Sequence, residues 1–210
     1  MYNLKYQMMR LCTNLSRIKL FVLAAFTFIV LCMSALMPCT ASAQDFAVTL
    51  YGGRVTNDIW SKSLTPGVEF ADAYIVVGAF TWTAKRFFNK ALSLELEGSI
   101  GKYFGDQDNL EFNLPIVAAR WNLFPWNKYV ATSFAFGIGP SYATEVPPLE
   151  EVINESSQQW LIHWFGELTF GPPQKNWSVA MRLHHRSGGF GTVAEYGAIN
   201  ILTAGIKYRW

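Results

Sequence analysis

The sequence predicts an all-β protein: an eight-stranded antiparallel transmembrane β-barrel that follows a cleaved signal peptide. Three observations support this prediction. The N-terminus carries a basic and then apolar leader, the rest consists of short runs in which apolar and polar residues alternate, and the connections between these runs alternate between long and short. Aromatic residues make up 16% of the chain and charged residues 15%, and no sustained 3.6-residue apolar period follows the leader, so strands are expected.

Residues 1–43 have the organisation of a secretory signal peptide. They include four basic residues and no acidic one, an almost wholly apolar run over 20–37, and small residues at 41–43 where cleavage is expected. The apolar run is also long enough for a retained membrane anchor, but Pro38 and the small residues favour cleavage. We therefore expect the barrel to comprise residues 44–210.

The leader also holds all three cysteines, Cys12, Cys32 and Cys39, so no disulfide or thiol chemistry is expected after cleavage. The formal charge of +2 depends on the basic residues of the leader, and the remaining chain has more acidic than basic residues. Its charge therefore gives no indication of nucleic-acid binding. No phosphate loop, dinucleotide fingerprint or basic–aromatic nucleic-acid pattern is found, and we expect no cofactor and no metal site.

Eight strands are expected, at 46–53, 71–86, 92–103, 110–123, 130–143, 160–170, 177–187 and 199–210. The clearest is 92–103, where leucines alternate with serine and glutamates because successive side chains of a strand point to opposite faces. Aromatic and aliphatic residues likewise share one face in four other strands: Tyr74, Val76, Phe80 and Trp82; Phe134, Phe136 and Ile138; Trp160, Ile162, Trp164 and Leu168; Leu202, Ala204, Ile206, Tyr208 and Trp210.

Alternation alone also fits a soluble sandwich or a lipocalin-like barrel, so the connections decide in favour of a membrane barrel. The connections that are long or polar are 54–70, 104–109, 144–159 and 188–198, and the short ones are 87–91, 124–129 and 171–176. Transmembrane barrels pair long extracellular loops with short periplasmic turns. Phe87, Phe88, Trp126 and Trp177 lie at the short-turn end, where an aromatic girdle is expected. The final Tyr208-Arg209-Trp210 resembles the C-terminal signal that the barrel-assembly machinery recognises.

The strand 177–187 carries a His-x-Ser pair, His185 and Ser187, on its apolar face. This face should contact lipid, whereas Arg182, His184 and Arg186 should point inward, with His184 contacting one of the carboxylates Glu95, Glu97 or Glu167. If the N-terminus is periplasmic, the pair lies at the extracellular end of the strand, level with the outer leaflet. In a Gram-negative outer membrane, that leaflet is lipopolysaccharide.

A histidine and a serine on one strand face can form the base and nucleophile of an esterase. The serine hydroxyl needs a base, and the base needs a third group that holds its ring. Candidates for the third group are Glu195, in the following loop, and Asn200, at the start of the last strand. We expect Glu195 to orient the imidazole, with Asn200 as the alternative. The backbone N–H of Gly188 is the nearest candidate for stabilising an oxyanion.

The segment 182–189, Arg-Leu-His-His-Arg-Ser-Gly-Gly, resembles the C-terminal signature of the PagL-like lipid A 3-O-deacylases. These eight-stranded outer-membrane barrels release a 3-hydroxy fatty acid from lipid A with a His-x-Ser pair and a downstream Glu. The resemblance implies that His185 is the base, that Ser187 is the nucleophile and that lipopolysaccharide is the substrate. Two positions depart from the family: Gly188 stands where Asn is usual, and Glu195 lies closer to the serine than the family's Glu does.

Two alternatives belong to other functional classes. The first is a non-catalytic outer-membrane barrel for envelope integrity or adhesion, in which His185 and Ser187 contact only lipid headgroups. The second is a periplasmic lipocalin-like carrier, which requires the leucine face of 92–103 to point inward.

Overall fold

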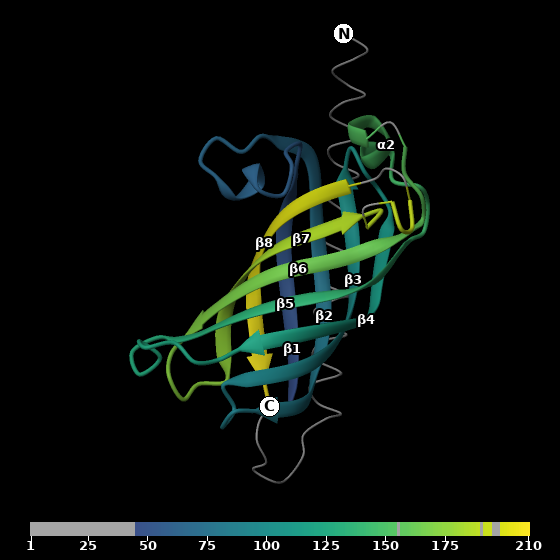
Figure 1. Cartoon of the computed structure of the whole chain (residues 1–210). Coiled ribbons are helices and arrows are strands. Elements are labelled where there is room, and N and C mark those ends of the chain that lie inside the picture. The colour runs from purple at the N-terminus through teal and green to yellow at the C-terminus, as the bar shows by residue number, and fades with distance from the viewer. Residues whose placement is uncertain (1–44, 155, 190, 195–197) are drawn as a thin grey trace. The chain divides into compact units, whose positions relative to one another are not determined.

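The computed structural model describes residues 45–154, 156–189, 191–194 and 198–210, so the predicted signal peptide lies outside the described residues. The chain forms a closed barrel in which each strand pairs antiparallel with its sequence neighbours and β1 pairs with β8 (Figure 1). The strands are β1 Phe46–Thr56, β2 Phe70–Phe87, β3 Leu92–Gly105, β4 Leu110–Trp121, β5 Ala131–Ala143, β6 Trp160–Gly171, β7 Trp177–Ser187 and β8 Ala198–Arg209. The predicted fold class is therefore confirmed.

Strand boundaries agree with the predicted ones to within two residues, except that β1 continues to Thr56. Gly52 and Gly53 were expected to be the last residues of this strand, but the strand continues beyond them, and they pair with Ala204 and Thr203 of β8. A Cβ atom at position 53 would lie 2.5 Å from the Leu202 carbonyl oxygen. Glycine is needed there because β1 and β8 approach closely, not because the chain turns.

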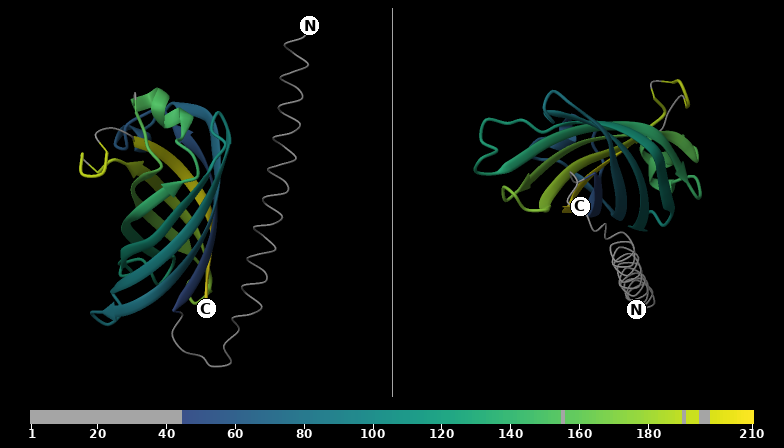
Figure 2. Two further views of the ribbon diagram at one scale, coloured as in Figure 1. Left: turned by 90° about the vertical axis from the view of Figure 1, so that its right-hand side faces the viewer. Right: turned by 90° about the horizontal axis from the view of Figure 1, so that it is seen from below.

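The connections gather at two ends of the barrel (Figures 1 and 2). One end, called here the loop end, carries the segments 57–69 with the 3-10 helix η1 (Lys62–Leu64), 106–109, the described part of 144–159 with the helix α2 (Pro148–Asn154), and the described part of 188–197. The opposite end, the turn end, carries 88–91, 122–130, 172–176 and the C-terminus. The predicted alternation of lengths fails at one place, since 106–109 is shorter than 122–130. No helix in the described ranges is long and apolar enough to cross a bilayer.

The alternating apolar residues face outward, as the membrane-barrel prediction requires. The side chain of Leu94 is 37% exposed, and Phe134, Phe136 and Ile138 of β5 are exposed as well. Their sequence neighbours Glu95 and Ala135 are buried in the barrel interior. The lipocalin-like carrier, which needs the leucine face of β3 to point inward, is therefore wrong.

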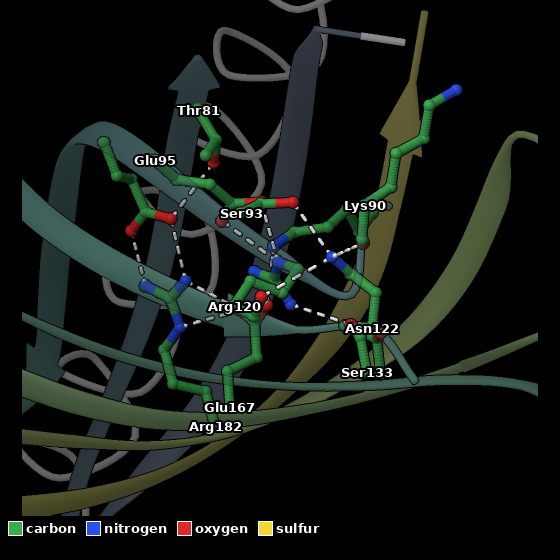
Figure 3. Close-up of polar contacts among 12 residues, drawn as sticks. Thr81, Lys90, Ser93, Glu95, Arg120, Asn122, Ser133, Glu167 and Arg182 are labelled. Carbon is green, nitrogen blue, oxygen red and sulfur yellow. Dashed lines mark hydrogen bonds and ion pairs between the residues drawn. The ribbon is translucent and has the colours of Figure 1, made fainter. Parts of the chain in front are cut away.

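The interior is filled by a charged network centred on Glu167 of β6 (Figure 3). Its carboxylate accepts hydrogen bonds from Arg120 Nη2 at 2.8 Å, Arg182 Nη2 at 2.7 Å and Lys207 Nζ at 2.5 Å, and a further one from the Tyr51 hydroxyl. Arg120 also contacts Glu95, and Arg182 also contacts Glu97. Three cations thus face three carboxylates, the pairing that buried charges need.

Nearer the loop end, two further inward residues each pair with a carboxylate, and the partner of His184 differs from those expected. His184 donates from Nε2 to Glu111 at 2.8 Å and not to Glu95, Glu97 or Glu167. Arg186 binds Glu150 of α2, so the helix covers this end of the lumen through a buried ion pair. Sequence alternation placed both side chains inside correctly, but it could not show which carboxylate lies at the same height across the barrel.

Candidate functional site

His185 lies in a row of outward-facing residues that crosses three strands. Its cross-strand neighbours are Trp164 of β6 and Asn200 of β8, while Ser187 lies between Ile162 and Ala198 in the next outward row. Directly opposed residues have Cβ atoms about 4.5–5.5 Å apart, so their side chains meet without any rearrangement of the backbone. Strand register thus brings together residues that are distant in the sequence.

The imidazole of His185 is held on both sides. The centroids of its ring and of the Trp164 ring lie 4.5 Å apart, with an interplanar angle of 37°. On the other side, His185 Nδ1 lies 2.6 Å from Asn200 Oδ1. The Nδ2 group of Asn200 donates to the Asp58 carbonyl oxygen at 2.8 Å, which fixes the orientation of the amide. Because Oδ1 can only accept, Nδ1 of His185 carries the proton and Nε2 keeps its lone pair.

The segment 57–69, called here the covering loop, folds over the outer wall of the barrel beside His185, where it contacts β6 and β8. Besides the bond from Asn200 to Asp58, Thr56 Oγ1 lies 2.7 Å from Ser63 Oγ, and the Trp60 ring packs edge-on against Trp164 with centroids 6.3 Å apart. His185 is consequently only 6% exposed, although it faces outward, whereas Met181 on the same face is 56% exposed.

This cover corrects the prediction that His185 lies on an open lipid-facing stripe. The orientation is as predicted, because Arg182, His184 and Arg186 point into the lumen. The surroundings of His185 differ from the prediction, because the covering loop lies more than 100 residues earlier in the sequence. The alternating pattern of β7 does not indicate that a distant loop covers it. Ser187 is partly exposed, and among the described residues no hydrogen bond joins it to His185.

The structure describes one of the two candidates for the third group. Asn200 occupies Nδ1 of His185, whereas Glu195 lies outside the described residues and its role stays a prediction. The structure also gives a reason for Gly188: a Cβ atom there would lie 2.2 Å from the Ala194 carbonyl oxygen. The carbonyl of Gly188 accepts hydrogen bonds from the N–H groups of Val193 and Ala194. An asparagine at position 188 would not fit this turn.

Sequence reasoning missed three participants in this site: Trp164, Trp60 and Asp58. Trp164 could have been found, since its predicted outward face and its place in the hairpin with β7 set it beside His185. No local pattern indicated the covering loop. Among the described residues one cluster has the composition of a metal site, Glu111, His163 and His184, whose ligand atoms lie within 4.8 Å of one another. No metal was predicted from the sequence.

Asp58 links the covering loop to its own chain through its carboxylate. The pKa of this carboxyl lies below its usual value of 3.8, first because Oδ2 accepts a hydrogen bond from the Glu69 N–H at 2.8 Å and then because Oδ1 accepts one from Lys62 Nζ at 2.6 Å. A lowered pKa in the folded state means that the ionised form stabilises the loop above pH 3.8 and that this stabilisation is lost as the pH falls through the folded pKa.

We therefore expect amide hydrogen exchange in 57–69, corrected for its intrinsic pH dependence, to accelerate below pH 3.8. Asp58→Asn should exchange faster at neutral pH and should lack the acid step, because no carboxyl remains to titrate. The turn-end segment 122–130 serves as an internal control. An acid step of the same size in Asp58→Asn would show that another group controls the loop.

No family model matches the chain, and no curated protein sequence is similar to it. Among solved structures, three are similar to it, each at 12% sequence identity. The outer membrane enzyme PagL has a TM-score of 0.53, with 77% of this chain and 98% of that chain covered. Neisserial surface protein A has a TM-score of 0.48, with 79% of this chain and 97% of that chain covered. The Yersinia pestis outer membrane protein Ail, in a phospholipid bilayer nanodisc, has a TM-score of 0.40, with 80% of this chain and 100% of that chain covered. Because the identity is so low, the likeness to PagL bears on the fold alone: an eight-stranded antiparallel barrel of the outer-membrane type.

Proposed function

We propose that this protein is a serine esterase of the outer membrane of a Gram-negative bacterium, which removes an acyl chain from the lipid A of lipopolysaccharide, by inference its 3-O-linked hydroxyacyl chain. The hydrogen bond between His185 Nδ1 and Asn200 Oδ1 on the outer wall of the barrel carries the proposal. It leaves Nε2 as a base on the face that also bears Ser187, and a substrate that lies in the membrane can approach only from that face.

In the proposed reaction, His185 Nε2 takes the proton from Ser187 while Oγ attacks the carbonyl carbon of the ester. The Gly188 N–H supports the negative charge that develops on the carbonyl oxygen. The tetrahedral intermediate expels the sugar hydroxyl, which receives the proton from His185. Water, deprotonated by His185, then attacks the acyl-serine; the bond between Ser187 Oγ and the acyl carbon breaks, Oγ receives the proton from His185, and the fatty acid is released.

Two features of the site must change before this reaction can begin. Ser187 has to turn toward His185, and the covering loop has to yield at Trp60 to admit an acyl chain. Residues two apart on a strand are about 6.5 Å apart along the chain, so we expect a rotamer change of Ser187 to bring Oγ toward Nε2 while the hydrogen bond between His185 and Asn200 stays in place. Catalytic hydrogen bonds are commonly long without substrate and tighten when it binds.

Cells that express the wild-type chain should contain lipid A that lacks one hydroxyacyl chain, as measured by mass spectrometry. Ser187→Ala should abolish this loss, because no nucleophile remains. Ser178→Ala is a matched control on the same strand, since Ser178 Oγ is buried inside the barrel and has no hydrogen-bond partner among the described residues. Unmodified lipid A in cells with correctly folded wild-type protein would end the proposal.

The non-catalytic barrel is favoured by one observation, the absence of a described hydrogen bond between His185 and Ser187 beneath the covering loop. A serine-reactive lipid phosphonate distinguishes the two functions. The esterase should be labelled at Ser187 and should lose the label in His185→Ala. A structural or adhesion barrel should not be labelled, and substitution of either residue should leave its role unchanged.

A further inference from the structure

The loop end of the lumen holds a second histidine cluster, which the proposed esterase reaction does not use. His163 of β6 and His184 of β7 point inward, and their ring centroids lie 4.1 Å apart. Glu111 of β4 reaches the same place and contacts His184. Three strands therefore each contribute one potential metal ligand to a buried site.

The state of His163 is the strongest indication of a ligand. Its side chain is 0% exposed, and neither ring nitrogen has a hydrogen-bond partner among the described residues. The main chain of His185 approaches the ring without reaching hydrogen-bonding geometry. Buried imidazoles normally have both nitrogens satisfied, so an orphaned one that faces another histidine and a carboxylate calls for a partner that the chain does not supply.

The carboxylate of Glu111 is oriented from behind, as ligands of metal ions usually are. Its Oε2 accepts a hydrogen bond from the Tyr103 hydroxyl at 2.6 Å, and its Oε1 accepts one from Asn113 Nδ2 at 2.7 Å. Such outer contacts fix a ligating carboxylate in one position. Asn113 Oδ1 is itself buried without a hydrogen-bond partner among the described residues.

We propose that Glu111, His163 and His184 form a binding site for a divalent transition-metal ion, with Zn²⁺ as the first candidate. Two imidazoles and one carboxylate are a common zinc ligand set, with bonds of about 2.0–2.1 Å and neighbouring ligand atoms about 3.3 Å apart in a tetrahedral site. The ligand atoms here lie within 4.8 Å of one another, so small side-chain rotations close the site.

A hydrogen bond between His184 and Glu111 is enough to explain why these two side chains lie together. It does not explain why both ring nitrogens of His163 lack a partner among the described residues. A metal ion satisfies all three side chains at once. Because the ligands come from β4, β6 and β7, the ion would tie together strands that are not all neighbours. It would lie inside the lumen, whereas His185, adjacent to His184 in sequence, points to the outer wall.

The test uses the full chain without a polyhistidine tag, folded in detergent and freed of metal with a chelator. Zn²⁺ is titrated by calorimetry, and Co²⁺ is followed by visible absorption. One equivalent should bind to the wild type, and His163→Gln should weaken binding by more than about 100-fold, because losing a ligand costs more than losing an outer contact. His185→Gln is the matched control, and it should bind as the wild type does.

Each result has a defined meaning. Equal binding by His163→Gln, loss of binding in His185→Gln, or no binding by the folded wild type overturns the site. Should His163→Gln fail to fold, X-ray absorption of the zinc-loaded His185→Gln protein replaces it, because the chain contains three histidines and only two then remain. Two imidazole ligands support the site, and one or none overturns it. Neither measurement depends on esterase activity.

Discussion

Glu167→Gln should lower the free energy of unfolding by about 3–5 kcal/mol, because it leaves the buried Lys207 without a described counter-charge and leaves Arg120 and Arg182 with one carboxylate each. The Glu167 carboxylate contacts Arg120, Arg182 and Lys207, and all four side chains are buried. Glutamine keeps the shape of the side chain and a carbonyl acceptor, so the loss comes from charge and not from packing. Chemical denaturation of the barrel in lipid vesicles measures the change.

Two further variants make this expectation specific. Glu145→Gln removes a carboxylate from an exposed loop position and should change stability by no more than about 0.5 kcal/mol. The double variant Glu167→Gln with Lys207→Met should be more stable than Glu167→Gln alone, since one orphaned cation is removed with its partner. An effect of Glu167→Gln as small as that of Glu145→Gln would show that the lumen charges are screened by water.

Asn200→Ala should reduce the proposed deacylation rate by about 10²- to 10⁴-fold, because the imidazole loses the group that fixes its tautomer and orientation. The rate constant kcat should fall while KM changes little, since Asn200 contacts His185 and not the substrate. Asn200→Asp keeps an acceptor for Nδ1 and should restore much of the rate. Lipid A hydrolysis by the purified protein in mixed micelles measures both constants.

Asn200 also holds the covering loop, so loosening of that loop needs its own control. Thr56→Ala removes the contact between Thr56 Oγ1 and Ser63 without touching the imidazole, and it should leave kcat within a few-fold of the wild type. Glu195→Gln should likewise have little effect. If Asn200→Ala is fully active while Glu195→Gln and Ser187→Ala are not, Glu195 is the group that orients His185.

Local alternation was sufficient to predict the fold. The repeat of two, visible in Leu92, Leu94 and Leu96, follows directly from strand geometry and decides which face meets lipid. The predicted first strand ended too early, at Gly53, because glycine is used both for turns and for close strand contacts, and the sequence does not distinguish the two uses. The error at 106–109 arose because polarity was taken as a sign of length.

Only the part of the site that lies on a single strand could be predicted from the sequence. His185 and Ser187 share a face because they are two residues apart, and this holds in any β-sheet. Which residues lie beside them depends on the register of β6 and β8, and the cover over them depends on a loop that precedes them by more than 100 residues. The ligand cluster of Glu111, His163 and His184 was missed for the same reason, since its three strands meet only in the closed barrel.

The covering loop also bears on how the cylinder is sealed. Beta-barrels close where the first strand meets the last, and here the hydrogen bonds from Asn200 to Asp58 and from Thr56 to the Asn200 carbonyl straddle that seam. The same hydrogen bonds therefore hold the first strand to the last and keep the imidazole of His185 covered. A substitution that exposes His185 by breaking these two hydrogen bonds also weakens the closure between β1 and β8. At this place, easier access for a lipid from the bilayer therefore comes with a less stable barrel wall.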